Sequence, residues 1–132
     1  MPAPRRPRST ANRQAVLDLL SRSDHFRSAQ QLHVEIRGHE VPRIGLSTVY
    51  RILRTLADEK IAETQRAEDG EILYRLRAAP EHRHYLLCRR CGRAVGFTAD
   101  DIERHTSQLA RRHRFADVTH YIDLYGTCPR CT

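Results

Sequence analysis

Four cysteines are the residues whose types and spacing most clearly predict chemistry. They form two Cys-x-x-Cys pairs, Cys88 with Cys91 and Cys128 with Cys131, separated by 36 residues. Each pair places two sulfur atoms on one tight turn, and four thiolates complete the tetrahedral shell that zinc prefers. Such a shell leaves no open position, so we expect a structural zinc ion that ties both ends of the C-terminal half together. A thiol redox switch and unrelated buried cysteines are the alternatives.

Histidines and one glutamate form a second candidate metal site. His82 and His84 are two residues apart on an expected strand, so both imidazoles lie on the same side of it. His120 lies on the apolar side of another expected strand, and Glu103 lies near the start of the intervening helix. Three imidazoles and a carboxylate suit Zn(II), with Fe(II), Mn(II) and Ni(II) as alternatives. A histidine on an apolar face is more often an ordinary core residue, and spacing alone leaves that alternative open.

The third helix of the N-terminal half carries the candidate DNA contacts. Ser47, Thr48, Tyr50 and Arg51 place hydroxyls, a phenol and a guanidinium near its start. Arginine can bind guanine through two hydrogen bonds, and tyrosine can pack on a thymine methyl group. The formal net charge of +7 also suits a polyanionic partner. The alternative is a solvated helix face on a basic surface that has no partner.

Hydrophobic periodicity in the N-terminal half predicts helices followed by a β-hairpin. Thr10 and Ser28 are plausible N-caps, Gly38 can end the second helix, and Ser47 opens the third. The expected strands span residues 61–65 and 71–76, with the turn signal Asp69-Gly70 between them. This order predicts a winged helix-turn-helix.

The C-terminal half reads as a small α/β module, so the expected fold class is α+β. We expect strands at 84–87, 94–97 and 118–125, and a helix that Thr98 begins with Asp101 at capping-box spacing. The inner side of that helix is expected to carry Ile102, His105, Leu109 and Ala110. The expected domains are a DNA-binding domain at 1–77 with a basic arm at 1–9, a hinge at 78–81, and a dimerisation and metal-binding domain at 82–132.

Several classes of protein are disfavoured by what the sequence lacks. No apolar run approaches the roughly 18–20 residues of a membrane span. The basic N-terminus has no apolar segment after it, so we read no secretory signal and expect a cytoplasmic location. A Gly-rich phosphate loop and an H-E-x-x-H motif are both absent, and Ser47 and Thr48 suit helix capping better than acyl transfer. We therefore expect neither an enzyme nor a small-molecule substrate.

Five motifs in order resemble one family. They are Ser28–Leu32, Ile44–Arg51, Asp69–Glu71, Leu86–Gly92 and Gly126–Cys131. Over residues 8–131 the chain resembles the ferric uptake regulator family, and most of all its zinc uptake regulator branch. The resemblance implies a homodimer that represses metal-homeostasis genes when metal is bound. It also implies double-stranded operator DNA, an A/T-rich inverted repeat, as partner, and one structural zinc with one further divalent metal per subunit.

The resemblance also implies roles for single residues. Tyr50 and Arg51 match the base-reading pair, Arg8 matches a basic residue that reaches the minor groove, and Arg13 matches an arginine that contacts the DNA backbone. The cysteines match the structural zinc ligands. The second, regulatory metal site of the dimerisation domain is matched by His82, His84, Glu103 and His120.

One departure from the family pattern concerns its sensing site between the two domains. Arg83 and Tyr85 stand at two of its histidine positions, and Phe26 stands where many members have a histidine. A further ligand position falls near Arg75 or Arg77, and only Glu63 matches an acidic ligand. The usual sensing site is therefore dismantled. Either sensing passes to the His82, His84, Glu103 and His120 site, or Arg83 pairs with Glu63 and replaces the metal charge.

Competing functional classes follow from the same residues. A metal-responsive repressor, most naturally linked to zinc, is the first. Within that class the alternatives are a sensor of iron, nickel or manganese, or a relative that no longer senses metal. Two alternatives belong to other classes of protein. One is a zinc-ribbon module that binds RNA or protein, and the other is a thiol oxidoreductase with reactive cysteines.

Overall fold

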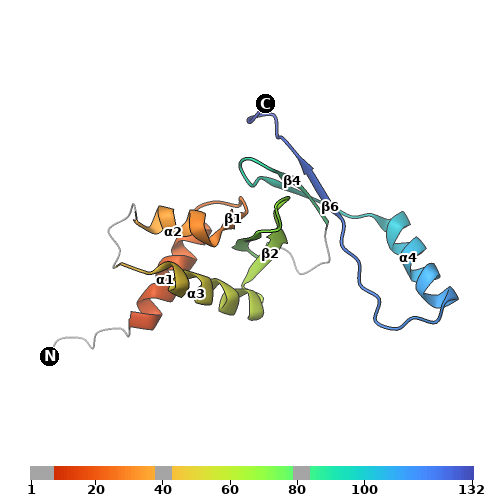
Figure 1. The fold of residues 1–132 in the computed structure, drawn as a ribbon, viewed down its shortest axis with the longest axis horizontal. Coiled ribbons are helices and arrows are strands. Elements are labelled where there is room, and N and C mark those ends of the chain that lie inside the picture. Colours follow the sequence, from red (N-terminus) through yellow and green to blue (C-terminus); the bar gives the residue numbers. More distant parts are fainter. Residues whose placement is uncertain (1–7, 38–42, 79–83) are drawn as a thin grey trace. The chain divides into compact units, whose positions relative to one another are not determined.

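The chain divides into two compact units, Met1–Ala79 and Pro80–Thr132, in the computed structural model (Figure 1). The structure describes residues 8–37, 43–78 and 84–132. Within these ranges no helix combines the length and the apolar character that crossing a bilayer requires.

The first unit is a winged helix-turn-helix, as the sequence predicts. Its helices are α1 (Arg8–Ser21), α2 (Ala29–Arg37) and α3 (Leu46–Asp58). Its sheet has the order β1-β3-β2, with β1 at Arg27–Ser28, β2 at Ala62–Arg66 and β3 at Ile72–Leu76. Figure 1 shows the helices gathered together and the hairpin following α3 along the chain.

The core of the first unit fixes how α3 is rotated. Val49, Leu53 and Leu56 are fully buried, at spacings of four and three residues that place them on one side of the helix. They pack in a cluster with residues of the other two helices, among them Val16, Leu20 and Leu32. The polar side of α3 is consequently turned toward solvent.

Helix capping follows the prediction at α2 and departs from it elsewhere. The Ser28 hydroxyl accepts a hydrogen bond from the Gln31 amide at 3.0 Å, and the Gln31 side chain accepts one from the Ser28 amide at 2.8 Å. This is a reciprocal capping box. Thr10 lies inside α1, which begins at Arg8, so the predicted cap there is wrong. Gly38 lies outside the described residues.

Ser47 does not cap α3 either. The helix begins one residue earlier, at Leu46, and its N-cap is Gly45 in an extended conformation (φ −70°, ψ 155°) without a side-chain cap. The Gly45 carbonyl accepts the first helical hydrogen bond, from Val49 at 3.1 Å. The side chains of Ser47 and Thr48 therefore do not cap the helix and belong to its surface.

The hairpin turns where Asp69-Gly70 predicts. Gly70 has φ +92°, a conformation that side chains disfavour. The Asp69 carboxylate accepts a hydrogen bond from the Glu71 amide at 3.0 Å. The strands it joins begin one residue later than expected, at Ala62 and Ile72.

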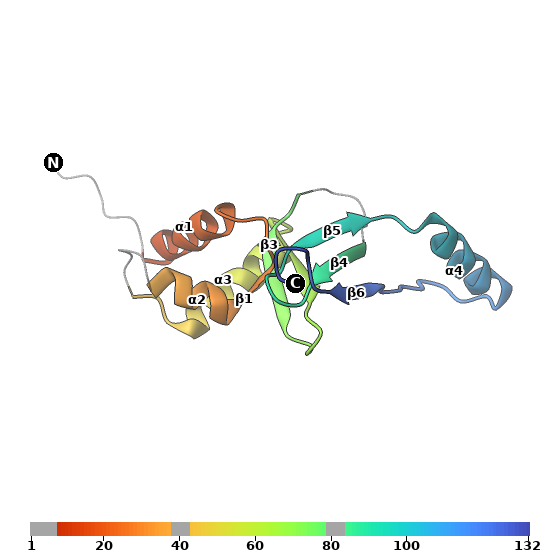
Figure 2. The same ribbon diagram turned by 90° about the horizontal axis from the view of Figure 1, so that it is seen from above.

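The second unit is a small sheet with a helix beside it. The sheet order is β5-β4-β6, with β4 at His84–Cys88, β5 at Ala94–Phe97 and β6 at Asp123–Gly126. β4 runs antiparallel to β5 and parallel to β6. Helix α4 spans Asp100–Arg112 and lies beyond the end of this sheet rather than across its face (Figure 2).

The prediction that one side of α4 is buried is wrong for a single chain. None of the residues of α4, all of which the structure describes, is buried. Ile102 is 46% exposed and Leu109 47%; His105 is exposed and Ala110 half-buried. The apolar stripe exists as predicted, but no element among the described residues covers it.

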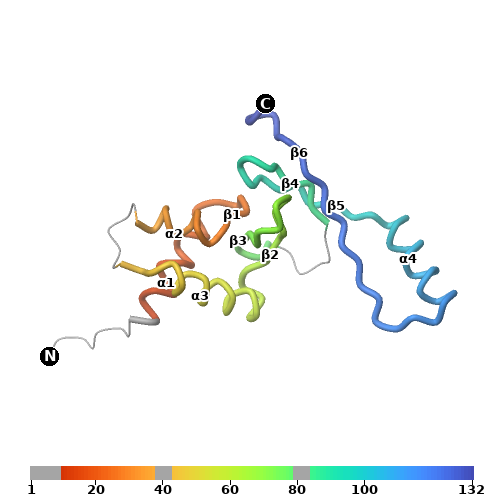
Figure 3. Tube along the Cα trace, viewed as in Figure 1, coloured from red at the N-terminus to blue at the C-terminus, as the bar shows by residue number. Residues whose placement is uncertain are grey.

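Two further expectations about the second unit need correction. Thr98 does not begin α4, because the N-cap is Ala99 and no side chain caps the helix. The expected strand 118–125 is reduced to Asp123–Gly126, which pairs with residues 85–88 of β4. Residues 113–122 return from α4 as an irregular segment (Figure 3), since the paired part of β4 extends no further.

Candidate metal centres and nucleic-acid interface

The four cysteines meet at one end of the second unit. Their ligand atoms all lie within 4.8 Å of one another. Cys88 ends β4 and Cys91 follows in a turn, while Cys128 and Cys131 occupy the turn after β6. The parallel pairing of β4 with β6 places Cys88 beside Gly126, which brings the two turns together.

The surroundings of the sulfur atoms favour a thiolate at Cys88 and disfavour one at Cys131. The Cys128 amide donates a hydrogen bond to the Cys88 sulfur at 3.3 Å, and this bond and that of the Cys91 amide lower the pKa of Cys88 to about 5. The Cys128 sulfur beside Cys131 instead raises the pKa of the Cys131 thiol to about 12. A thiolate at one cysteine therefore disfavours ionisation of its neighbour. A bound divalent cation compensates this charge repulsion. The donor set and the N–H···S bond fit a structural zinc ion.

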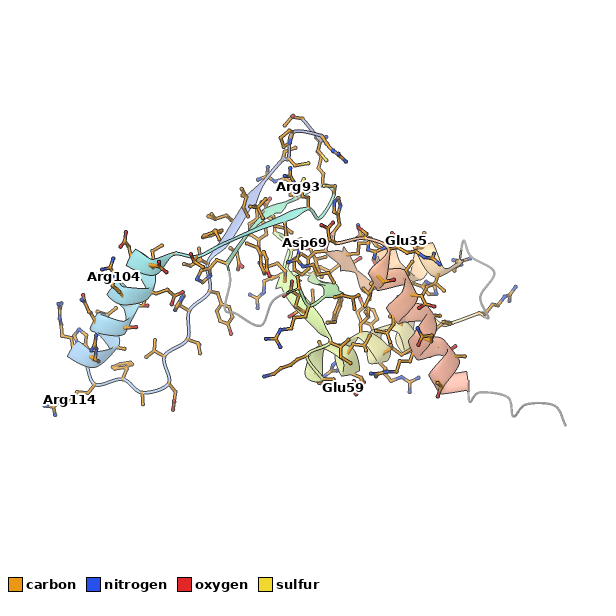
Figure 4. All side chains as sticks on the ribbon, turned by 180° about the vertical axis from the view of Figure 1, so that it is seen from behind. Glu35, Glu59, Asp69, Arg93, Arg104 and Arg114 are labelled. Atoms are coloured by element: carbon orange, nitrogen blue, oxygen red, sulfur yellow. The ribbon has the colours of Figure 1, made fainter. Side chains whose placement is uncertain are left out.

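Arginines fasten the two cysteine turns to each other. The Arg89 guanidinium donates to the Thr127 hydroxyl at 3.2 Å and to the Tyr125 carbonyl at 3.4 Å. The Arg90 guanidinium donates to the Cys131 carbonyl at 3.3 Å. Arg93, labelled in Figure 4, follows in the segment between β4 and β5. These bonds hold the turns in register.

His84, Glu103 and His120 form the second cluster. The Nε2 atoms of His84 and His120 lie 2.9 and 3.0 Å from the same Glu103 oxygen. The two rings are 5.3 Å apart, and the Phe97 ring lies 5.8 Å from that of His84, which is buried. The structure thus brings together three of the four predicted ligands. His82 lies outside the described residues.

These three residues come from separate elements: β4, α4 and the segment before β6. Two imidazole nitrogens and one carboxylate oxygen converge on one point, and their ligand atoms lie within 4.8 Å of one another. This donor set suits zinc and other first-row divalent ions. No residue of α4 is buried, and the contact of Glu103 with His84 links α4 to β4 of the sheet.

The predicted base-reading residues lie on the solvent side of α3. Ser47, Tyr50 and Arg51 are exposed. The Arg51 guanidinium donates to the Thr48 hydroxyl at 3.3 Å, and the Arg51 carbonyl accepts a hydrogen bond from Thr55 at 3.0 Å. The predicted residues therefore lie together on α3, and Arg51 is hydrogen-bonded to its own helix.

Arg13 has a partner that the sequence did not suggest. Its guanidinium donates to the Glu59 carboxylate at 2.6 Å, and both side chains are partly exposed. Glu59 is the C-cap of α3 and is labelled in Figure 4. Residues 46 positions apart give no local signal for this pair. Arg8 is the first residue of α1, and its side chain lies outside the description.

Residues at the family's sensing positions are occupied within their own units. Arg75 donates to Glu63 at 2.5 Å and lies 4.4 Å from the centre of the buried Phe26 ring. Tyr85 is buried on β4. Arg83 lies outside the described residues, so its pairing with Glu63 stays a prediction.

Comparison with known proteins agrees with the resemblance. The zinc uptake regulation protein of Mycobacterium tuberculosis (strain CDC 1551 / Oshkosh) is 41% identical over 124 residues, which cover 94% of each chain. The crystal structure of FurB from M. tuberculosis, a zinc uptake regulator, matches with a TM-score of 0.54 and 41% identity over 95% of each chain.

A solved zinc uptake regulator complexed with zinc and DNA matches with a TM-score of 0.68 and 30% identity, over 94% of this chain and 83% of that one. The model of the ferric uptake regulator family matches residues 5–125. With the winged helix, the small β4–β6 sheet and both ligand clusters in place, this chain belongs to the ferric uptake regulator family.

Proposed function

We propose that this chain is a zinc-responsive repressor that binds operator DNA as a homodimer. The observation that carries the proposal is the presence of two chemically different ligand clusters in one unit, four sulfurs in one and imidazoles with a carboxylate in the other. A closed thiolate shell holds zinc as part of the fold, whereas a nitrogen and oxygen site exchanges metal more readily. The first cluster is therefore structural and the second regulatory.

The roles of the ligands follow from this division. Cys88, Cys91, Cys128 and Cys131 hold the structural zinc. His84, Glu103 and His120, with His82 as fourth ligand, hold the regulatory ion. Since His84 and His120 both point at one Glu103 oxygen, an ion at that point links β4, α4 and the segment before β6. Loss of the ion frees α4, and α4 carries the apolar stripe that a second subunit covers.

The DNA contacts belong to the first unit. Tyr50 and Arg51 read base edges in the major groove, with Ser47 and Thr48 beside them on α3. Arg13 contacts the backbone and Arg8 reaches toward the minor groove. A dimer presents two such helices, so the operator is an inverted repeat, for which we propose an A/T-rich sequence. Such a repressor shares the cytoplasm with its DNA.

The relatives favour zinc as the regulatory ion. The similar proteins include zinc uptake regulators, and one solved relative is complexed with both zinc and DNA. Fe(II), Mn(II) and Ni(II) suit the same donors, so they are the competitors that an experiment must include.

The test is a metal-dependent binding measurement. An operator is first selected from a random duplex library with the zinc-loaded protein, and its affinity is then measured by fluorescence anisotropy with each metal in turn. We expect zinc to strengthen binding while His84→Ala and His120→Ala abolish the metal dependence. Metal analysis should give two zinc ions per wild-type chain and one per variant. If both variants bind the selected duplex as tightly as the wild type, with and without zinc, the regulatory role is wrong.

A further inference from the structure

A second arginine on the exposed side of α3 has no role in the proposed function. The exposed positions Ser47, Tyr50, Arg51 and Arg54 recur at spacings of three, one and three residues, so they form one stripe along the helix. The opposite side is anchored by Val49, Leu53 and Leu56, which are fully buried. The core therefore forces Arg54 onto the same side as the base-reading pair.

Several arginines among the described residues of the first unit are held by a partner side chain, whereas Arg54 is not. Arg13, Arg27 and Arg75 are each paired with a carboxylate, and Arg51 is bonded to the Thr48 hydroxyl. Arg54, by contrast, has no hydrogen-bond or ion-pair partner among the residues that the structure describes. Its charge is available to an external anion.

Tyr74 is an electrostatic neighbour of Arg54 and does not neutralise it. Burial raises the pKa of the Tyr74 phenol, the Tyr50 phenol raises it further, and the Arg54 charge only partly opposes this. The phenol is therefore uncharged at neutral pH. The Tyr74 phenol therefore does not pair with the exposed Arg54 guanidinium as a counter-ion.

Helix dimensions separate Arg54 from the base-reading residues. An α-helix rises about 1.5 Å per residue, so Tyr50 and Arg51 lie roughly 6 to 8 Å along the axis from Leu46, and Arg54 lies about 12 Å along it. In helix-turn-helix motifs the N-terminal residues of this helix contact the base edges. Arg54 lies one turn beyond Tyr50 and Arg51, further from that end, where phosphates rather than base edges are the expected partners.

We infer that Arg54 binds a DNA phosphate and sets affinity without contributing to base choice. This inference rests on the proposed DNA-binding function. A guanidinium fixed to its own helix, like that of Arg51, suits the directional contact that bases require. One without a partner suits a phosphate, which requires charge more than direction.

The experiment compares Arg54→Ala, Arg54→Lys, Arg51→Ala and Lys60→Ala on two duplexes, one selected by the wild-type protein and one rejected by it, over a range of salt. We expect Arg54→Ala to weaken binding to both duplexes equally, by roughly eightfold per bound subunit at 0.1 M salt, and to reduce the salt slope by about 0.9. Arg54→Lys should restore both values, because lysine keeps the point charge.

The other variants act as controls. Lys60 follows the C-terminal end of α3 and is also exposed, so Lys60→Ala removes the same charge away from the groove and should leave the slope unchanged. Arg51→Ala should instead reduce the preference for the selected duplex. Thermal melting checks that each variant is folded.

Two results would overturn the inference: an unchanged salt slope in Arg54→Ala, or a loss confined to the selected duplex, which would make Arg54 a base-reading residue. The proposed function fails separately, if selection with the wild-type protein enriches no duplex from the random library. In that case the salt slope still tests Arg54, since phosphate contact does not require sequence preference.

Discussion

Glu63 and Arg75 face each other across the antiparallel pairing of β2 with β3, and the Arg75 Nε donates a hydrogen bond of 2.5 Å to the Glu63 carboxylate. Arg75 also donates to the Asp24 carbonyl at 3.2 Å and lies over the Phe26 ring. The side chains of Arg75 and Glu63 are only 11% and 17% exposed. Glu63, the acidic residue that matches a family sensing ligand, is thus paired with Arg75 of the same sheet.

Arg75→Ala should destabilise the first unit. Removal of one member of a buried ion pair typically costs about 3–5 kcal/mol, and the partial exposure of Glu63 reduces this to about 2–4 kcal/mol. Urea unfolding followed by circular dichroism measures the change. Arg54→Ala is the matched control, because an exposed arginine should alter the unfolding free energy by less than about 0.5 kcal/mol. Equal stability of the two variants would contradict the structural role of Arg75.

Glu59→Gln should strengthen DNA binding. The Glu59 carboxylate accepts a hydrogen bond from Arg13 at 2.6 Å and so competes with phosphate for that guanidinium. A partly exposed pair of this kind is worth up to about 1 kcal/mol, so we expect a gain of roughly two- to fivefold on any duplex. In the Arg13→Ala background the same change should have no effect. Weaker binding by Glu59→Gln would mean that Glu59 orients Arg13 instead.

Removal of the structural zinc should unfold the second unit selectively. Among its described residues the buried hydrophobic ones are Tyr85, Leu87 and Cys88, a core too small to hold a sheet without the metal. In Cys91→Ser, hydrogen exchange should become fast in β4, β5 and β6 while the amides of α1 and α3 stay protected. Slow exchange throughout zinc-free protein would show that the sheet is stable by itself.

Leu109→Glu should produce monomers. Ile102 and Leu109 are seven residues apart on one side of α4 and about half exposed, as expected of a face that a second subunit covers. Placing a carboxylate there should weaken association by roughly 100-fold. Ser107→Glu adds the same group on the opposite side of α4 and should leave the dimer intact. Analytical ultracentrifugation distinguishes the two, and an unchanged sedimentation coefficient for Leu109→Glu would exclude this face from the interface.

Local patterns in the sequence were enough to predict the order of the elements. The Ser28 cap, the Asp69-Gly70 turn and the buried stripe of α3 depend on residues within a few positions of one another, and all three are present. The cysteine spacing likewise predicted one cluster. Short-range hydrogen bonds and the periodicity of apolar residues determine these features, so the sequence alone is enough to predict them.

Tertiary structure decided which side chains meet. The pairs Arg13 with Glu59 and Arg75 with Glu63, and the convergence of His84 and His120 on one Glu103 oxygen, join residues 12 to 46 positions apart. The predicted caps at Thr10, Ser47 and Thr98 were wrong, because the helices start one to three residues away from the positions that those caps predict. The expected strand 118–125 shortened to the length that β4 can pair. Long-range contacts depend on strand register and helix rotation, which are set by burial across the whole unit rather than by any local run of residues.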